Sequence, residues 1–100
     1  MNLDELQNEV AKWSRKNFGS QISDNPLFGV CEEVGELCHA HLKGKQGIRH
    51  TPTEIRDMKL DAIGDIIIYL ADYCERENLD LSLAIDVAWT VVSKRDWREK

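Results

Sequence analysis

Two short acidic motifs, each set in an apolar segment with helical periodicity, constrain the fold of this chain most strongly. The first places Glu32, Glu33 and Glu36 within one turn and a half of helix, and the second places Asp61 and Asp65 four residues apart. Carboxylates three or four positions apart are neighbours on a helix and repel each other by a few tenths of a kcal/mol per pair. Something other than the helix itself must therefore hold these acids together, and a hard divalent cation is one candidate.

The first motif lies on one side of a helix beside a wide apolar arc. At 3.6 residues per turn, Glu33 and Glu36 lie about 60° apart around the axis, and Glu32 lies about 40° from Glu36. An interior glycine costs roughly 1 kcal/mol relative to alanine, so the glycines here predict open space beside the acids. For this motif alone, an ordinary solvated helix face is the alternative interpretation. The strip holds Gly29, Glu33, Glu36 and Ala40 with Gly35 nearby, and the arc holds Leu27, Val30, Cys31, Val34, Leu37, Cys38 and Leu42.

The second motif favours a metal site over a solvated face. Asp61 and Asp65 share one strip, and Asp72 follows two turns further along. The run Ile66–Ile68 is apolar nearly all round the axis, so we expect this helix to be buried there. A carboxylate beside such a run is costly unless it is paired, hydrogen-bonded or bound to a metal. Two helices with paired carboxylates therefore predict a metal site between them.

Together the two motifs carry a family resemblance. Residues 32–36 (EEVGE) and 61–65 (DAIGD) resemble the signature of the MazG-type all-α nucleoside triphosphate pyrophosphohydrolases, which is E-E-x-x-E followed by E-x-x-D on the next long helix. The resemblance extends from residues 13–18 to residues 94–95, although only the acidic motifs are specific. It implies an all-α four-helix bundle that forms homo-oligomers.

The resemblance also implies a set of metal ligands. The acids of the signature fall on Glu33, Glu36 and Asp65, whereas the fourth ligand, a glutamate in the family, falls on Ala62. Asp61 is the nearest possible replacement, since positions 61 and 62 flank Asp65 at about 40° and 60° around the axis. The rival interpretation is that the fourth position is empty.

A carboxylate-bound magnesium ion would connect these residues to phosphate chemistry. Mg²⁺ prefers octahedral oxygen ligands and usually binds through carboxylates, water and substrate phosphates, and Mn²⁺ is a possible substitute. By resemblance, the reaction is hydrolysis of a nucleoside triphosphate between the α and β phosphates. It releases a monophosphate and pyrophosphate, for cleansing or regulating the nucleotide pool. Glu32 is expected either to orient or deprotonate the attacking water or to support the metal ligands.

Further residues are candidates for binding the nucleotide. Aromatic residues near the end of the first helix contact the base in the family, which favours Trp13 and, more weakly, Asn17, although Trp13 and Phe18 also fit an ordinary core. Basic residues on the last helix lie near the site in the family, and each basic residue alone is also typical of a surface. The candidates for contacting the phosphates are Lys43, Lys59, Lys94 and Arg95.

Two alternative functions come from other classes of protein. The first is a di-iron carboxylate protein, because Glu36 and His39 form an E-x-x-H motif. Such bundles need this motif on two helices, and the second copy is missing. The second alternative is a catalytically inactive helical module that binds a metal or a partner, with Ala62 marking a lost ligand.

Length and charge restrict the remaining possibilities. One hundred residues fit a single domain, 1–100. A net charge of −5 argues against a nucleic-acid surface, which needs a basic patch. No apolar run approaches the ~20 residues that span a bilayer, and the acidic N-terminus lacks a signal-peptide core. A chain this short with many aliphatic residues is expected to form a homodimer or homotetramer.

The cysteines indicate a reducing compartment. Their number is odd, and no C-x-x-C pair occurs, so reduced thiols in the cytoplasm are expected. Cys31 and Cys38 are too far apart along a helix to bridge each other within one chain. We expect all three, including Cys74, to fill the core.

Capping signals predict four helices and no strands. Gly44 and Gly47 are expected to break the second helix, and residues 43–50 form a basic loop that is either a mobile connection or a lid over the phosphates. The third helix could bend near Lys59, and the fourth is expected to pack its Leu83, Val87 and Val91 face on the others. The predicted helices run from the Asn2 cap to Gly19, from the Asn25–Pro26 cap to about Lys43, from the Thr51 cap to about Glu77, and from about Leu81 to Trp97.

Overall fold

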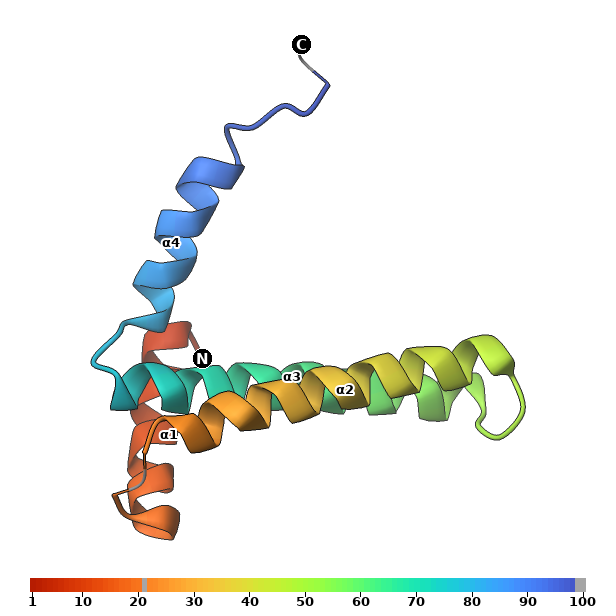
Figure 1. Ribbon diagram of the computed structural model, residues 1–100, viewed down its shortest axis with the longest axis horizontal. Coiled ribbons are helices and arrows are strands. Elements are labelled where there is room, and N and C mark those ends of the chain that lie inside the picture. Colours follow the sequence, from red (N-terminus) through yellow and green to blue (C-terminus); the bar gives the residue numbers. More distant parts are fainter. Residues whose placement is uncertain (21, 99–100) are drawn as a thin grey trace.

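The computed structural model describes residues 1–20 and 22–98, and this part of the chain is entirely helical and loop. The all-α class and the four predicted helices are confirmed. The two long helices α2 and α3 form an antiparallel hairpin, α1 crosses one end of it, and α4 projects from that same end (Figure 1). The helices are α1 (Leu3–Phe18), α2 (Asp24–Gln46), α3 (Pro52–Arg76) and α4 (Leu81–Val92).

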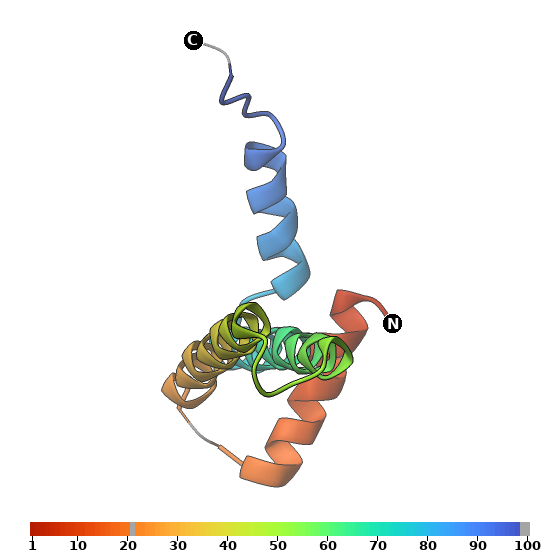
Figure 2. The ribbon, with the colours of Figure 1, turned by 90° about the vertical axis from the view of Figure 1, so that its right-hand side faces the viewer.

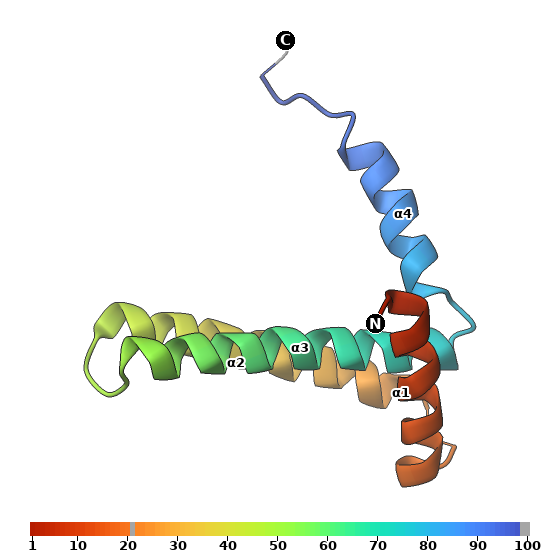
Figure 3. The ribbon, with the colours of Figure 1, turned by 180° about the vertical axis from the view of Figure 1, so that it is seen from behind.

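The hairpin has one covered flank and one open flank. Seen along its length (Figure 2), α2 and α3 lie side by side, with α1 on the side of α3. From behind (Figure 3), α1 crosses the C-terminal end of α3. Among the described helices, α2 contacts α3 alone. The side of α2 that faces away from α3 is therefore uncovered.

The predicted N-terminal caps are confirmed at three helices. At the start of α3, the Thr51 hydroxyl accepts a hydrogen bond from the Glu54 backbone N–H (3.1 Å), and the Glu54 carboxylate accepts one from the Thr51 N–H (2.9 Å). This reciprocal box satisfies two backbone donors that a helix leaves unpaired at its start. Asn2 and Asp80 cap α1 and α4 with their side-chain oxygens.

The start of α2 differs from the prediction. The helix begins at Asp24, with Ser23 as its cap residue, and not with Asn25 as cap. Pro26 thus lies inside the first turn, where its missing N–H leaves no hydrogen bond unmade. The cap at this helix is the weakest of the four, because the Ser23 side chain makes no capping hydrogen bond.

The end of α2 also differs from the prediction. The helix continues through Gly44 to Gln46, and only Gly47 ends it, with φ of +66° and its N–H bonded to the Lys43 carbonyl. Gly44 is a packing residue and not a helix breaker, since a Cβ there would lie 3.0 Å from Ile55 on α3. The first half of the predicted basic loop, residues 43–46, is therefore helix, and the connection to α3 is short.

α3 is a single helix through Lys59, where the sequence left a bend open. It ends near the predicted position, because Asn78 adopts a positive φ of 55°. The Leu79 N–H then bonds to the Cys74 carbonyl at 2.8 Å, as in the turn that commonly closes helices. This turn redirects the chain into α4.

The core lies where α1 crosses α3 and meets the start of α4. Its buried residues are Val10, Ala71, Cys74 and Leu81. Gln7 is buried beside them, and its amide accepts from the Leu81 N–H (2.9 Å) and donates to the Leu79 carbonyl (2.8 Å). One amide thereby ties α1 to the connection between α3 and α4.

A largely buried ion pair within the last turns of α3 is hydrogen-bonded to α1. The Asp72 carboxylate accepts hydrogen bonds from the Ser14 hydroxyl and from Arg76 Nε, both at 2.9 Å. Asp72 is only 6% exposed and Ser14 1%. The acid that the sequence places two turns beyond Asp65 is thus neutralised by an arginine within the fold.

The predicted packing of α4 is wrong. Its Leu83, Val87 and Val91 face is more than half exposed, at 58%, 59% and 53%, and Leu81 is the buried residue of this helix. The helix also ends at Val92 and not near Trp97. The cause is the turn after α3, which points α4 away from the hairpin (Figure 1).

The prediction that all three cysteines fill the core is correct only for Cys74. Cys31 and Cys38 are exposed on α2, because they lie on the side of the helix that faces away from α3. None of the described helices is both long and apolar enough to cross a membrane.

Candidate functional site

The two acidic motifs face each other across the α2–α3 hairpin. A cavity of about 250 Å³ lies between them, and side chains from both motifs line it. Ala62 forms part of its wall and is only 3% exposed, whereas the neighbouring Asp61 is exposed. We call this space the acidic cavity, and its lining residues are Glu32, Glu33, Glu36, Met58, Asp61, Ala62 and Asp65.

The electrostatics of the acidic cavity centre on Glu33. Partial burial raises the pKa of Glu33, and the negative charges of Asp65, Glu32, Glu36 and Asp61 raise it further. Like charges that share a site disfavour each other's ionised form, and a nearby cation has the opposite effect. The cavity therefore presents a concentration of negative charge that a bound cation would relieve.

The donor chemistry of this cavity suits a hard cation. All of its ionisable groups are carboxylates, and carboxylate oxygen is what Mg²⁺ binds, usually through one or two carboxylates with the rest supplied by water and phosphate. Among residues 1–20 and 22–98, no group of three or more His, Cys, Asp or Glu side chains is placed so that it could hold a metal ion. The predicted Mg²⁺ or Mn²⁺ site thus stays a prediction.

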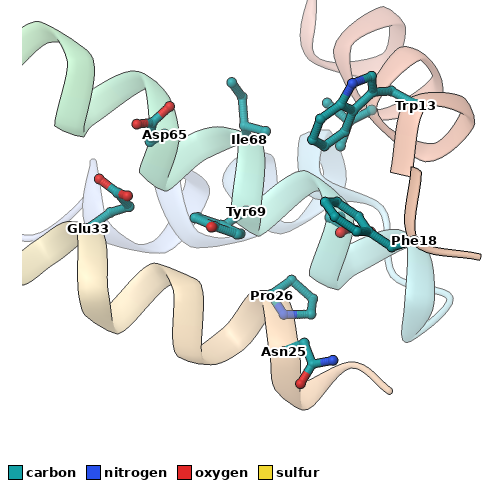
Figure 4. Close-up of a pocket in the computed structure, with 10 residues that line it drawn as sticks. Trp13, Phe18, Asn25, Pro26, Glu33, Asp65, Ile68 and Tyr69 are labelled. Atoms are coloured by element: carbon teal, nitrogen blue, oxygen red, sulfur yellow. The ribbon is translucent and has the colours of Figure 1, made fainter. Parts of the chain in front are cut away.

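A second, larger cavity of about 490 Å³ adjoins the acidic cavity and shares Glu33 and Asp65 with it (Figure 4). We call it the aromatic cavity. Trp13 and Phe18 stand edge to face at its α1 side, with ring centroids 5.4 Å apart and planes at 86°. Its lining residues are Val10, Trp13, Phe18, Asn25, Pro26, Glu33, Asp65, Ile68, Tyr69 and Asp72.

Gly29 on α2 makes room for the Tyr69 ring, which lines the aromatic cavity. A Cβ at this position would lie 2.5 Å from the Tyr69 ring, so the absence of a side chain lets the ring lie against α2. The predicted open space beside the acids is therefore occupied by Tyr69. At Gly35 the predicted open space is present, since a Cβ there would meet no atom within 4 Å, although the residue lines neither cavity.

The structure brings together only some of the predicted substrate residues. Trp13 lines the aromatic cavity. Asn17 does not, because its amide donates to the Trp13 carbonyl at 2.8 Å on the same helix. Lys59 lines a separate cavity of about 730 Å³ near the hairpin loop, and Lys43 Nζ donates to Gln46 Oε1 at 3.2 Å near the end of α2.

Lys94 and Arg95 lie far from both cavities within this chain. They follow α4, and the segment after α4 points away from the hairpin (Figure 1). The Arg95 guanidinium stands 5.7 Å from the centre of the Trp97 ring. A contact between these two residues and the acidic cavity is therefore not made within one chain.

Sequence reasoning missed several residues of the aromatic cavity. Tyr69 and Ile68 stand within the apolar run of α3 and resemble core residues, and Pro26 resembles only a helix start. One signal was available, since Tyr69 follows Asp65 by four positions and so lies on the same face. The contribution of α1 required knowing that it crosses this end of the hairpin.

No family model, no curated protein and no solved structure matches this chain.

Proposed function

We propose that this protein is a magnesium-dependent nucleoside triphosphate pyrophosphohydrolase that cleaves between the α and β phosphates. The observation that supports this function best is the wall shared by the two cavities. Glu33 and Asp65 line both the aromatic cavity and the acidic cavity. An aromatic space next to a carboxylate cluster suits a ligand with a flat apolar end and an anionic end that needs a cation.

The aromatic cavity would hold the nucleoside. Its volume of about 490 Å³ lies within the range of small-molecule sites. Trp13, Phe18 and Tyr69 offer ring faces and edges to a base, and aromatic stacking on a base is worth roughly 1–3 kcal/mol per base. The triphosphate would then extend past Glu33 and Asp65 toward the acidic cavity.

The acidic cavity would perform the hydrolysis. Glu33, Glu36 and Asp65, with Asp61 in place of the missing fourth acid, would hold Mg²⁺, which neutralises phosphate oxygens and polarises bound water. Glu32 would orient the water or accept its proton. The water oxygen bonds to phosphorus, the α–β bridging bond breaks, and pyrophosphate leaves.

An inactive helical module is the second candidate, and one observation favours it. Ala62 is buried in the wall of the acidic cavity, so the fourth carboxylate of the resembled family is missing from that wall. The di-iron alternative has less support, because Glu36 and His39 are both exposed. The function proposed here requires neither a coloured iron centre nor a reaction with oxygen.

A nucleotide screen with pyrophosphate detection tests the proposed function. Common and modified nucleoside triphosphates are incubated with the protein and Mg²⁺, and the products are separated. We expect monophosphate and pyrophosphate from at least one substrate, with none in EDTA. Asp65→Asn should abolish the activity, whereas Asp86→Asn, on the exposed face of α4, should not. Orthophosphate and diphosphate as the products would mean that a different bond is cleaved.

If no substrate is hydrolysed, cation binding separates the two candidates. Titration calorimetry with Mg²⁺ and Mn²⁺ that shows binding lost in Asp65→Asn would support the inactive module. Absence of both hydrolysis and cation binding would contradict the hydrolase and would leave only the form of the inactive module that binds a partner.

A further inference from the structure

The side of α2 that faces away from α3, the one helix that α2 contacts among those described, carries an exposed apolar strip. At 100° per residue its five members fall within an arc of about 80°. Leu27 is 39% exposed, Val34 44% and Leu42 51%, and both cysteines of the strip are exposed as well. We call it the outer strip of α2, and its members are Leu27, Cys31, Val34, Cys38 and Leu42.

The order of residues along the outer strip is the same from either end. Leu27 and Leu42 are equidistant from the midpoint between Val34 and Gly35, and so are Cys31 and Cys38. This midpoint is also close to the centre of the whole helix, which runs from residue 24 to residue 46. A strip with this symmetry can therefore pair with the same strip of a second copy that runs antiparallel to it.

Charge follows the same symmetry. Asp24 and Lys45, near opposite ends of α2, are equidistant from the same midpoint. In an antiparallel pair of α2 helices, each Asp24 would therefore meet the Lys45 of the second copy. At the midpoint, a Cβ on Gly35 would meet no atom within 4 Å in the single chain, which leaves room for a second helix.

We propose that two copies of this chain associate through their outer strips, with the α2 helices antiparallel about a two-fold axis between Val34 and Gly35. A two-fold interface uses the same patch on both subunits, so if residue i of one copy meets residue j of the other, residue j also meets residue i. Leu27 then packs on Leu42 of the second copy, and Cys31 faces Cys38 of the second copy. The homo-oligomer expected from the sequence thereby acquires a defined surface and register.

The dimensions of the single chain favour a second copy of the chain as the partner that covers the outer strip. Its exposed area is 7707 Å², against about 5,800 Å² for a compact monomer of this mass. Its radius of gyration is 16.6 Å, against about 13 Å for 100 residues. The excess of about 1,900 Å² includes the exposed face of α4, so only part of it is available to an interface at the outer strip.

The interface leaves the acidic cavity open. Glu36 lies about 160° around the axis of α2 from Cys38, so the carboxylates point away from the proposed partner. The function proposed above and the dimer are thus independent, and each can fail without the other.

Cysteine crosslinking tests the register. Helices packed about 9 Å apart, with Cα atoms about 2.3 Å from each axis, bring facing Cα atoms to about 4.4 Å, at the short end of the disulfide range. Diamide takes two electrons and two protons from each pair of thiols. We expect it to convert the wild-type chain to a covalent dimer, while the buried Cys74 stays reduced.

Single variants make the outcome specific to the proposed pairing. Neither Cys31→Ser nor Cys38→Ser alone should crosslink, because each lone cysteine would face a serine. The two variants unfolded and refolded together should crosslink up to about half of the chains, the statistical share of mixed dimers. A covalent dimer from Cys38→Ser alone would mean that Cys31 meets Cys31, and would overturn the register.

A charge at the centre of the interface tests the dimer itself. Val34→Glu places two carboxylates against each other at the two-fold axis. At about 10 micromolar chain, it should lower the sedimentation coefficient from that of a dimer to that of a monomer. Leu60→Glu is the matched control, since Leu60 is similarly exposed, at 55%, but lies on α3. A monomeric wild-type chain, or a dimer that Val34→Glu leaves intact, would refute the interface.

Discussion

Replacing Gly29 by alanine should destabilise the protein, although the same change normally stabilises a helix. The added Cβ would lie 2.5 Å from the Tyr69 ring, so the ring must leave its position in the aromatic cavity. Overpacking of this kind costs about 1–3 kcal/mol, and the gain in helix propensity returns about 1 kcal/mol. The expected net effect is a loss of up to about 2 kcal/mol.

Gly64→Ala is the matched control for this change. Gly64 is also inside a long helix, and a Cβ there meets no atom within 4 Å, so this variant should gain about 0.5–1 kcal/mol. Urea unfolding followed by circular dichroism should therefore separate the two variants by about 1–3 kcal/mol. If Gly29→Ala proves as stable as Gly64→Ala, the Tyr69 ring does not pack on α2 as described.

Three further outcomes are expected. Asp72→Ala removes the carboxylate that pairs with the largely buried Arg76 and should cost about 3–5 kcal/mol in urea unfolding, whereas Arg15→Ala, which breaks an exposed ion pair, should cost less than about 1 kcal/mol. Asp61→Asn should lower activity about tenfold or more at limiting Mg²⁺, while Ala62→Glu adds a carboxylate at a buried position and should not raise it; a silent Asp61→Asn would mean that the fourth ligand position is empty. The raised pKa of Glu33 means that the native state holds the proton more tightly than the unfolded chain, so in the absence of cations stability should fall as pH rises from the ordinary carboxyl pKa through the raised one. Glu33→Gln should remove this fall, and a thermal melting series between pH 4 and 7 would contradict the account if wild type and variant ran in parallel.

Local signals in the sequence predicted the four helices and the N-terminal caps of α1, α3 and α4. The Thr51 and Glu54 box acts within one turn of chain, so its residues alone decide the outcome. The facing of the two acidic motifs was also predictable, because a short connection between two long helices makes them antiparallel neighbours. Both results depend on residues that are close in sequence or on helices that are adjacent in it.

Features that depend on distant parts of the chain were not predictable. The aromatic cavity needs Trp13 on α1 to meet Tyr69 on α3, and no local pattern sets the angle at which α1 crosses. The direction of α4 is set in the turn after α3, where Asn78 adopts a positive φ, and no helical periodicity encodes the path of that turn. The cysteines of α2 were assigned to the core because an apolar arc marks which side of a helix is hydrophobic, and not which neighbour covers it.

The attachment of α4 determines which part of this protein unfolds locally. The helix has twelve residues, near the length at which an isolated helix is marginal in water, and Leu81 with the amide of Gln7 anchors it to the rest. Its backbone amides should therefore exchange with deuterium through a local opening that leaves the α2–α3 hairpin protected. Gln7→Leu, which keeps the bulk and removes the three hydrogen bonds of the Gln7 amide, should speed exchange along α4 and leave the middle of α3 unchanged, so that a single side chain separates two cooperative units.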